Sequence, residues 1–347
     1  MLYFCKNTVC KIRLSGTITW QPIQYVMVSR IELVNIMSFC IFHHIKSIKV
    51  WENMMEFTKK SKIAIVGTGK LGGSLALALS AASYNVVSVF SRNANSALNV
   101  SKEIDGCIPS SDIQETINVA EIVFITTPDD VISKIANSSK WSDSQGVIHC
   151  SGASGIELFS SIESCIEFGS FHPMQTFSSI KEGSKSMQGI TFAIDGTDKI
   201  VGFLKEITNS FNSGFVLIPS EYKPMYHLTG TLMGNLLLEY VAISAKLWEQ
   251  IGYDQEKGIQ SLVPMMRQVA DNLENIGLPE ALAGPFVRGD IGTIKKHLEI
   301  LKEDAPQALN LYCELALAGF YFVKEDIEMN LELKEEITEM LKSKLQR

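Results

Sequence analysis

Hydrophobic and polar positions follow two different periods along this chain. From Lys62 onward, short apolar runs typical of buried strands alternate with turns and with segments of helical spacing. We expect strands at 63–66, 86–90, 121–127, 146–150 and 190–194, with the first helix at 71–82. This alternation predicts an α/β fold, namely a Rossmann-type doubly wound, mostly parallel sheet with helices on both faces.

After Pro219 the strand pattern stops and long helical segments follow. Helices are expected at 222–251, 255–276, 291–301, 305–323 and 324–345. We therefore assign residues 58–219 to a dinucleotide-binding Rossmann domain and 220–347 to an all-helical substrate and dimerisation domain. Residues 1–57 do not share either pattern. We interpret them as an N-terminal extension from an over-extended start ahead of Met54, with a targeting peptide as the competing interpretation.

The composition narrows the class of protein. A formal net charge of -7 with 46% hydrophobic residues argues against a general nucleic-acid surface or an anionic membrane surface, because both need clustered positive charge. The seven cysteines form no C-x-x-C pair, which favours reduced thiols, a cytoplasmic location and no metal site. No apolar run reaches the roughly 18 residues of a membrane span.

A glycine-rich turn between the first strand and the first helix has the form G-x-G-x-x-G. Gly67 is expected to make the tight turn, Gly69 to let the backbone approach a pyrophosphate, and Gly72 to let helix and strand pack closely. The helix N-terminus adds amide donors and a positive dipole end. We predict that the cofactor-binding residues of this turn are Gly67, Thr68, Gly69, Lys70, Leu71 and Gly72.

The end of the second strand indicates which dinucleotide binds. NAD-binding proteins usually place an acidic residue there, whereas this chain has Ser91 and Arg92. A guanidinium and a hydroxyl suit the 2′-phosphate of NADP, so we predict NADP as the cofactor. Thr127 and Pro128 follow another strand end and extend the cofactor site, while Ser151 follows the next and is assigned to substrate binding.

Three further segments carry a family resemblance. They are the heptapeptide 171–177, the segment 223–227 followed by Asn235, and the segment 284–290 leading to His297. Over about residues 62–323, the chain resembles the Rossmann-like proteins with a helical DUF2520 domain, relatives of pyrroline-5-carboxylate reductase, ketopantoate reductase and prephenate dehydrogenase. The resemblance implies an NADP-linked oxidoreductase with a second domain like that of 6-phosphogluconate dehydrogenase, and a homodimer formed through that domain.

These segments also supply the candidate reaction site. His172 precedes Pro173, which holds the backbone extended, and the H-P-M tripeptide is similar to one in prephenate dehydrogenases, whose histidine contacts the reacting hydroxyl. Related dehydrogenases place a lysine and an asparagine on the first long helix of the second domain. We therefore list His172, His227, Lys223 and Asn235 as catalytic candidates. Arg288 is assigned to a substrate carboxylate, and Asp290 is expected to cap the helix from Ile291.

Two classes of function remain open from the sequence. The first is an NADP-dependent oxidoreductase that transfers hydride to or from a small carbonyl, imine or hydroxy-acid metabolite, and the second is a non-catalytic NADP-sensing protein. A third hypothesis is that the protein uses deazaflavin F420 as its redox partner. The substrate itself is not encoded in any motif, because the fold alone does not determine the reaction. In both classes the site is expected between the two domains.

Overall fold

The computed structural model describes strands at 2–5, 8–12 and 18–21, and residues 56–162, 166–322 and 330–345. Its main feature is one eight-stranded sheet with the order β11-β10-β9-β8-β7-β4-β5-β6. The strands are β4 (Ile63–Val66), β5 (Val86–Phe90), β6 (Ile108–Ser110), β7 (Ile122–Ile125), β8 (Gly146–His149), β9 (Glu167–Pro173), β10 (Thr191–Gly196) and β11 (Gly214–Leu217). Only the β9–β10 pair is antiparallel in this sheet. The predicted Rossmann-type sheet is thus confirmed.

Helices cover both faces of this sheet, which explains its near-continuous apolar strands. Every residue of β4, β7 and β8 is buried. One face packs on α2 (Lys70–Ala81), α3 (Ala94–Ser101) and α7 (Asp198–Ser210), through side chains such as Leu79, Val100 and Phe203. The other packs on α4 (Ile113–Asn118), α5 (Asp129–Ser138) and the short helix η1 (Ile156–Phe159).

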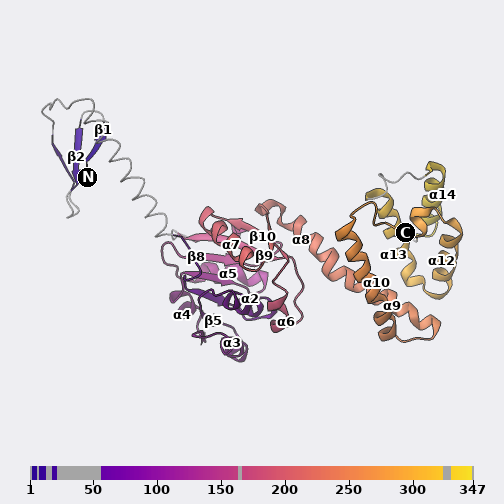
Figure 1. Cartoon of the computed structure of the whole chain (residues 1–347), viewed down its shortest axis with the longest axis horizontal. Helices are drawn as coiled ribbons and strands as arrows, with labels where there is room; N and C mark the ends of the chain where they lie inside the picture. Colours follow the sequence, from indigo (N-terminus) through magenta and orange to yellow (C-terminus); the bar gives the residue numbers. More distant parts are fainter. Residues whose placement is uncertain are drawn as a thin grey trace.

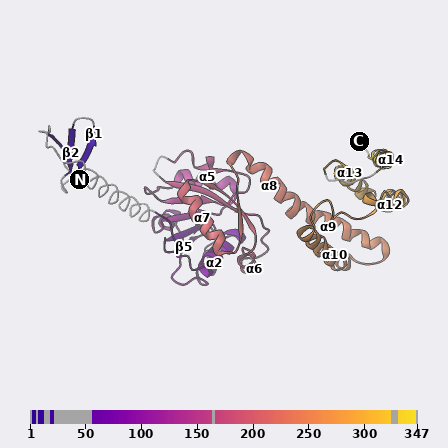
Figure 2. The ribbon, with the colours of Figure 1, turned by 45° about the horizontal axis from the view of Figure 1, so that its top comes forward.

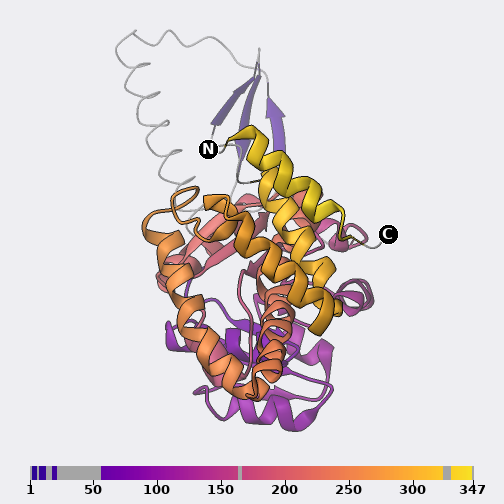
Figure 3. The same ribbon diagram turned by 90° about the vertical axis from the view of Figure 1, so that its right-hand side faces the viewer.

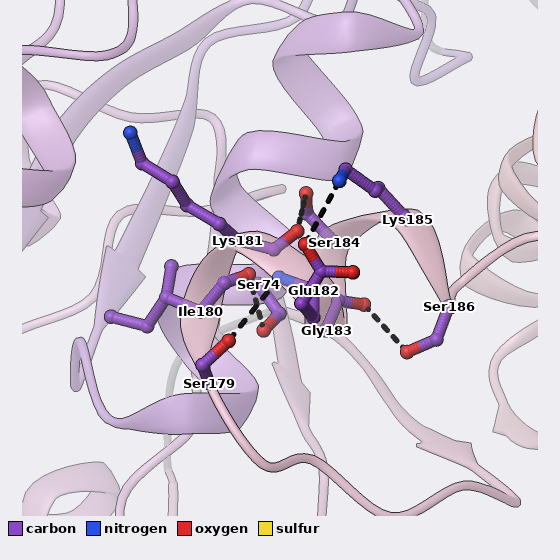
Figure 4. Close-up of polar contacts among 9 residues, drawn as sticks. All are labelled: Ser74, Ser179, Ile180, Lys181, Glu182, Gly183, Ser184, Lys185 and Ser186. Carbon is purple, nitrogen blue, oxygen red and sulfur yellow. Dashed lines mark hydrogen bonds and ion pairs between the residues drawn. The ribbon is translucent and has the colours of Figure 1, made fainter.

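The short helix α6 (Ile180–Lys185) lies against α2, as Figure 4 shows. The Ser74 hydroxyl of α2 donates a hydrogen bond to the Ile180 carbonyl at 3.1 Å. A Cβ on Gly183 would come within 2.2 Å of the Ser74 hydroxyl oxygen, so the approach requires a glycine. This contact anchors the segment after His172 to the helix that begins at the glycine-rich turn.

The expected long helix at 222–251 is a rod of four pieces. It comprises α8 (Lys223–Thr231), the π-helical turn η3 (Leu232–Leu236), α9 (Leu237–Lys246) and the 3-10 turn η4 (Leu247–Ile251), after a 3-10 turn η2 (Ser220–Tyr222). The rod leads away from the sheet to the remaining helices (Figures 1 and 2). The π-helical turn was not predicted, because the sequence analysis treated 222–251 as one continuous α-helix.

Further helices follow the rod in the described part of the chain. They are α10 (Gln255–Asn275), α11 (Pro285–Arg288), α12 (Ile291–Asp304), α13 (Pro306–Phe322) and α14 (Leu331–Lys342). Helices α12, α13 and α14 pack side by side (Figure 3) around buried side chains that include Leu298, Cys313 and Leu341. The expected helix at 324–345 begins only at Leu331, after the N-cap Asn330, and residues 324–329 lie outside the described residues.

Three short strands in the N-terminal segment were not predicted. β1 (Leu2–Cys5), β2 (Thr8–Ile12) and β3 (Ile18–Gln21) form their own antiparallel sheet. The rest of the proposed extension up to residue 55 lies outside the described residues. The extension therefore stays an interpretation of the sequence.

Candidate functional site

The glycine-rich turn has the geometry that its sequence predicts. Gly67 has φ +112°, and a Cβ there would meet the Thr126 carbonyl at 3.0 Å. A Cβ on Gly72 would lie 1.9 Å from the Gly67 carbonyl oxygen, which no side chain can accept. By contrast, nothing lies within 4 Å of a Cβ placed on Gly69. The protein thus packs tightly at two of the glycines and leaves the space above the third free for a ligand.

A second observation tests whether a dinucleotide fits this turn. The Thr127 hydroxyl oxygen, at the end of β7, is buried and has no hydrogen-bond partner among the described residues. Buried polar atoms without a partner are rare in folded proteins, and a bound ligand is one explanation for such an atom. Together with the open space at Gly69 and the start of α2, this orphaned hydroxyl fits a cofactor that binds along the carboxyl ends of the strands.

The other predicted cofactor residues divide into two groups. Ser91 and Arg92 follow β5 directly, and Arg92 is exposed in the segment before α3. Lys70 is exposed at the start of α2, and Pro128 is the N-cap of α5. The side chains of the second group face the protein instead. Thr68 is 1% exposed and donates to Ser96 at 2.8 Å, while Leu71 packs on the core. These two residues shape the turn and offer only backbone groups to a ligand.

The loop after β8 forms the floor of the candidate reaction site. The Ser151 hydroxyl donates to the Asp129 carboxylate at 2.7 Å and accepts from the Ser154 amide at 3.0 Å. Because both contacts are internal and Ser151 is 2% exposed, we reassign it from substrate binding to holding this loop. Its neighbour Gly152 is the residue that reaches the site. A Cβ there would fall 2.4 Å from His227 Cδ2 and 2.7 Å from His172 Nε2.

His149, which the sequence analysis missed, shapes the same loop. Its Nδ1 accepts from the Ser151 amide at 3.1 Å, so Nε2 carries the proton and donates to the Gly155 carbonyl at 2.9 Å. Burial, together with the Lys223 ammonium, lowers the pKa of His149 to about 4. The ring is therefore neutral and structural. Its position at a strand end was the available signal, but nothing in the sequence separates this histidine from a reactive one.

His172 and His227 lie together, as predicted. Their ring centroids are 5.8 Å apart, His172 at the end of β9 and His227 on α8. His172 Nδ1 is 2.9 Å from the hydroxyl of Tyr226, a residue that sequence reasoning did not select. Burial, followed by the charge of Lys223, lowers the pKa of His172 to about 3. His172 is thus an uncharged ring at neutral pH, which makes it a hydrogen-bonding group and not an imidazolium acid.

Lys223 is the most unusual group in the site. A lysine at the start of a helix is normally solvated, yet the Lys223 side chain is fully buried and donates to the Ser170 hydroxyl at 2.7 Å. Burial lowers the pKa of Lys223 to about 8, although the Asp195 carboxylate partly opposes this effect. Its ammonium is close enough to lower the pKa values of His149 and His172. The lysine therefore lies beneath the histidines as a buried, titratable charge.

A cavity of about 340 Å³ opens where the loop after His172 faces α8 and η3. Gly230 and Gly234 let this loop approach, because Cβ atoms there would lie 2.8 Å from Met174 Sδ and 3.1 Å from Thr176 Cγ2. The predicted residues His172, His227 and Asn235 line it together, with Asn235 on the π-helical turn. The other lining side chains are Met174, Gln175, Thr176, Thr231, Met233, Leu237 and Leu238. Lys223 is not among them.

Arg288 lies elsewhere. It ends α11, among the helices beyond the rod, and it does not line the cavity that contains the histidines. Within one chain the assignment of Arg288 to a substrate carboxylate is therefore not supported. Its neighbour Asp290 is the N-cap of α12, as expected, and accepts from the Thr293 amide at 3.0 Å. Among the described residues, no group of His, Cys, Asp or Glu side chains could hold a metal ion.

Two family models match the chain and confirm the resemblance seen in its sequence. Residues 62–153 match the model described as NADP oxidoreductase, coenzyme F420-dependent, and residues 190–318 match the DUF2520 domain of unknown function. The chain is thus similar to the cofactor domain of NADP oxidoreductases over the first range and to DUF2520 over the second. The cofactor expected from Ser91 and Arg92, NADP, agrees with the first model. No curated protein matches the chain.

Solved structures share this fold. A candidate NADP oxidoreductase from Bacteroides fragilis aligns with a TM-score of 0.61 at 23% identity, over 75% of this chain and 98% of that one. A protein from Thermotoga maritima gives 0.57 at 24% identity over 81% and 99%. Pyrroline carboxylate reductase from Plasmodium falciparum, solved with NADP bound, gives 0.52 at 13% identity over 83% and 99%. At these identities the likeness shows the fold.

Proposed function

We propose that this protein is an NADP-dependent oxidoreductase acting on a small carbonyl, imine or hydroxy-acid metabolite. The observation that carries the proposal is the meeting of His172 and His227 against Gly152, at the carboxyl end of β8 and thus at the same edge of the sheet as the glycine-rich turn after β4. Ligands of doubly wound sheets bind at this edge. The bound nicotinamide would supply the hydride chemistry, and the protein supplies binding, orientation and proton management.

Each group contributes to this function in a definite way. Gly69, the start of α2 and the Thr127 hydroxyl would hold the pyrophosphate and ribose side, and Arg92 the 2′-phosphate. His172, His227 and Asn235 offer hydrogen bonds to the substrate from two sides of the cavity. Lys223 does not line the cavity, so it acts through its charge and through Ser170. Because its pKa is about 8, it is able to hold or release a proton near neutral pH.

Turnover is the direct test of this proposal. The purified chain, mixed with NADPH and panels of carbonyl and imine compounds, should oxidise the cofactor with at least one of them. Hydroxy acids with NADP⁺ test the reverse direction, and reduced deazaflavin F420 replaces NADPH in a parallel series. Cofactor binding without turnover in any series would reject the enzyme and leave the fold as a cofactor-binding module.

One observation favours a second candidate, an NADP-sensing protein without turnover. The pKa of His172 is about 3 and burial raises the pKa of Tyr226 to about 12, so neither group exchanges a proton readily at neutral pH. A sensor needs no such exchange. The two candidates are separated by the turnover series above and by a ligand-induced change in oligomeric state, which only the sensor requires.

Substituting Gly69 with valine should weaken NADPH and NADH alike by roughly tenfold or more, because a branched side chain enters the free space where the pyrophosphate approaches. Folding should persist, since nothing in the protein lies within 4 Å of that position. Gly202→Val, at an equally open glycine of α7, is the matched control and should keep both affinities. Isothermal titration with each cofactor measures the difference. Unchanged binding by the Gly69 variant would remove the turn from the cofactor site.

We also propose that the protein is a homodimer formed through its helical domain. In the described part of the chain, the stretch Ser220–Ile251 is long and apolar enough to cross a membrane, with a hydropathy of 1.2, and only 6% of its most apolar window is buried. Leu232 and Leu236, one turn apart, are 50% and 51% exposed. A second copy of the chain would bury this apolar surface through the hydrophobic effect. The surface would then need no membrane to cover it. The fold and the cofactor site agree with a cytoplasmic protein.

The double variant Leu232→Lys, Leu236→Lys should be monomeric in analytical ultracentrifugation, whereas the unmodified chain sediments as a dimer. Two charges on a buried apolar surface oppose association, and neither leucine lines the histidine cavity. Leu98→Lys on α3, where the leucine is 39% exposed, is the control and should leave the dimer intact. A monomeric unmodified chain, or partition of the chain into neutral lipid vesicles, would contradict the dimer.

A further inference from the structure

The two ring nitrogens of His172 face different parts of the protein. Nδ1 lies 2.9 Å from the Tyr226 hydroxyl, and the two rings meet edge to face at 89° with centroids 5.5 Å apart. Nε2 faces the opposite way, 2.7 Å from the position that a Cβ on Gly152 would occupy. Nδ1 is therefore engaged with α8, and Nε2 is directed toward the end of β8, where a ligand of this fold binds.

The hydrogen bond to Tyr226 decides where the His172 proton lies. A neutral imidazole has one nitrogen that donates and one that accepts. Burial raises the pKa of Tyr226 to about 12, so the phenol keeps its proton and has it to donate. Within the described residues, His172 Nδ1 is the acceptor that this hydroxyl reaches. If Tyr226 donates to Nδ1, the proton of the neutral ring is on Nε2.

We propose that Tyr226 is a positioning residue that fixes His172 in its Nε2–H form, so that the site takes its substrate through an acceptor atom, a carbonyl oxygen or an imine nitrogen. This inference rests on the proposed oxidoreductase function and narrows it. An alcohol oxygen could accept the same hydrogen bond, but its own hydroxyl proton would find no acceptor on His172, because Nδ1 is already engaged by Tyr226. The site is thus complementary to the oxidised member of a carbonyl–alcohol or imine–amine pair.

The cavity wall fits the same class of substrate. The polar side chains that line it with His172 and His227 are amides and hydroxyls, such as Gln175, Thr231 and Asn235, and the others are thioethers and leucines. An amide or hydroxyl solvates a neutral carbonyl well but compensates a carboxylate less than a guanidinium does. Among the described residues, the cation that acts on His172 is Lys223, which is directed to Ser170 beneath the site. The substrate end held by this chain is therefore uncharged.

The proton position is measurable without any substrate. Long-range ¹H–¹⁵N spectra of the ¹⁵N-labelled full chain distinguish the two neutral forms of histidine, and His172→Gln identifies the signal by its loss. We expect His172 to show a protonated Nε2 and a bare Nδ1 at neutral pH. Tyr226→Phe should give a mixture of the two forms, whereas Tyr222→Phe, at a tyrosine 61% exposed, should not. A proton on Nδ1 in the unmodified chain would overturn the inference.

A matched pair of probes tests the ligand class. With NADPH present, cyclohexanone should shift the His172 Nε2 signal at concentrations about tenfold lower than cyclohexanol or cyclohexanecarboxylate, the scale of one hydrogen bond. Tyr226→Phe should abolish that preference. If cyclohexanol or cyclohexanecarboxylate shifts the signal at the same or lower concentrations than cyclohexanone, or if cyclohexanone causes no shift, the proposal of a carbonyl or imine substrate is rejected. Failure of the proposed function appears differently, as an absence of NADPH binding or turnover while the His172 proton is found on Nε2.

Discussion

Replacing Lys223 with methionine should make the protein more stable and at the same time nearly inactive. At neutral pH the buried ammonium costs about 3 kcal/mol, the free energy that corresponds to the depression of its pKa from 10.5 to about 8. Methionine fills a similar volume without a charge, so the free energy of unfolding should rise by about that amount. Turnover should fall roughly 100-fold, the scale of losing a positioned proton-holding group.

The stability gain should depend on pH in one direction. Below pH 8, Lys223 is charged in both the folded and the unfolded chain, and the full cost is present. Between about pH 8 and 10.5, the folded chain has released this proton while the unfolded chain still holds it, so the stability of the unmodified protein rises relative to the variant. The difference between the two proteins should therefore shrink over this range.

Urea unfolding at several pH values measures this difference, and cofactor oxidation measures the loss of activity. Lys181→Met is the control, because the Lys181 side chain is 72% exposed and should change neither quantity. A variant that is less stable than the unmodified chain would show that Lys223 holds the fold together. A variant with full activity would show that it has no part in the reaction.

Changing Arg92 to aspartate should reverse the cofactor preference. The unmodified chain is expected to bind NADPH more tightly than NADH, because the exposed guanidinium after β5 is able to hold the 2′-phosphate with two hydrogen bonds. Aspartate removes those bonds and adds repulsion, so NADPH affinity should fall by about 100-fold. NADH should bind as before or better, since a carboxylate accepts bonds from both ribose hydroxyls.

Fluorescence titration of both cofactors gives the two affinities for each protein. Arg267→Asp on the exposed face of α10 makes the same change in charge away from β5, and it should leave the NADPH preference intact. If NADPH and NADH bind equally to the unmodified chain, or if the Arg92 variant keeps the preference, the 2′-phosphate is held by other groups.

The sequence predicted the sheet well where apolar runs were short and bounded by turns, as at 63–66 and 86–90. The edge strands β6 and β11 were missed. β6 has only three residues and contains a proline, and β11 is a short, exposed run of four residues although three of them are apolar. β9 was not among the expected strands. The sequence indicated only an extended backbone at its end, where His172 precedes Pro173. Its antiparallel partnership with β10 depends on where the chain returns, which local pattern does not encode.

The site was predictable in its histidines but not in what surrounds them. His172, His227 and Asn235 share one cavity, as their motifs indicated. The burial of Lys223 was unexpected, because a lysine at a helix start is usually solvated and only tertiary packing shows that this one is covered. Tyr226 lies in the segment 223–227 that carries the family resemblance, but nothing in that segment marked it as a site residue. Its contact with His172 joins residues 54 positions apart, and such contacts leave no trace in a single sequence.

The position of α8 along the chain determines when its residues can dock on the sheet during synthesis. Every strand of the large sheet has been synthesised by Leu217, before the segment that supplies Lys223, Tyr226 and His227. Domains generally fold as units during synthesis, so the sheet is able to form with Ser170 and His172 still open to water. The last step is then the burial of a lysine that must give up its hydration, so docking of α8 is the step that carries the free-energy cost of this buried charge.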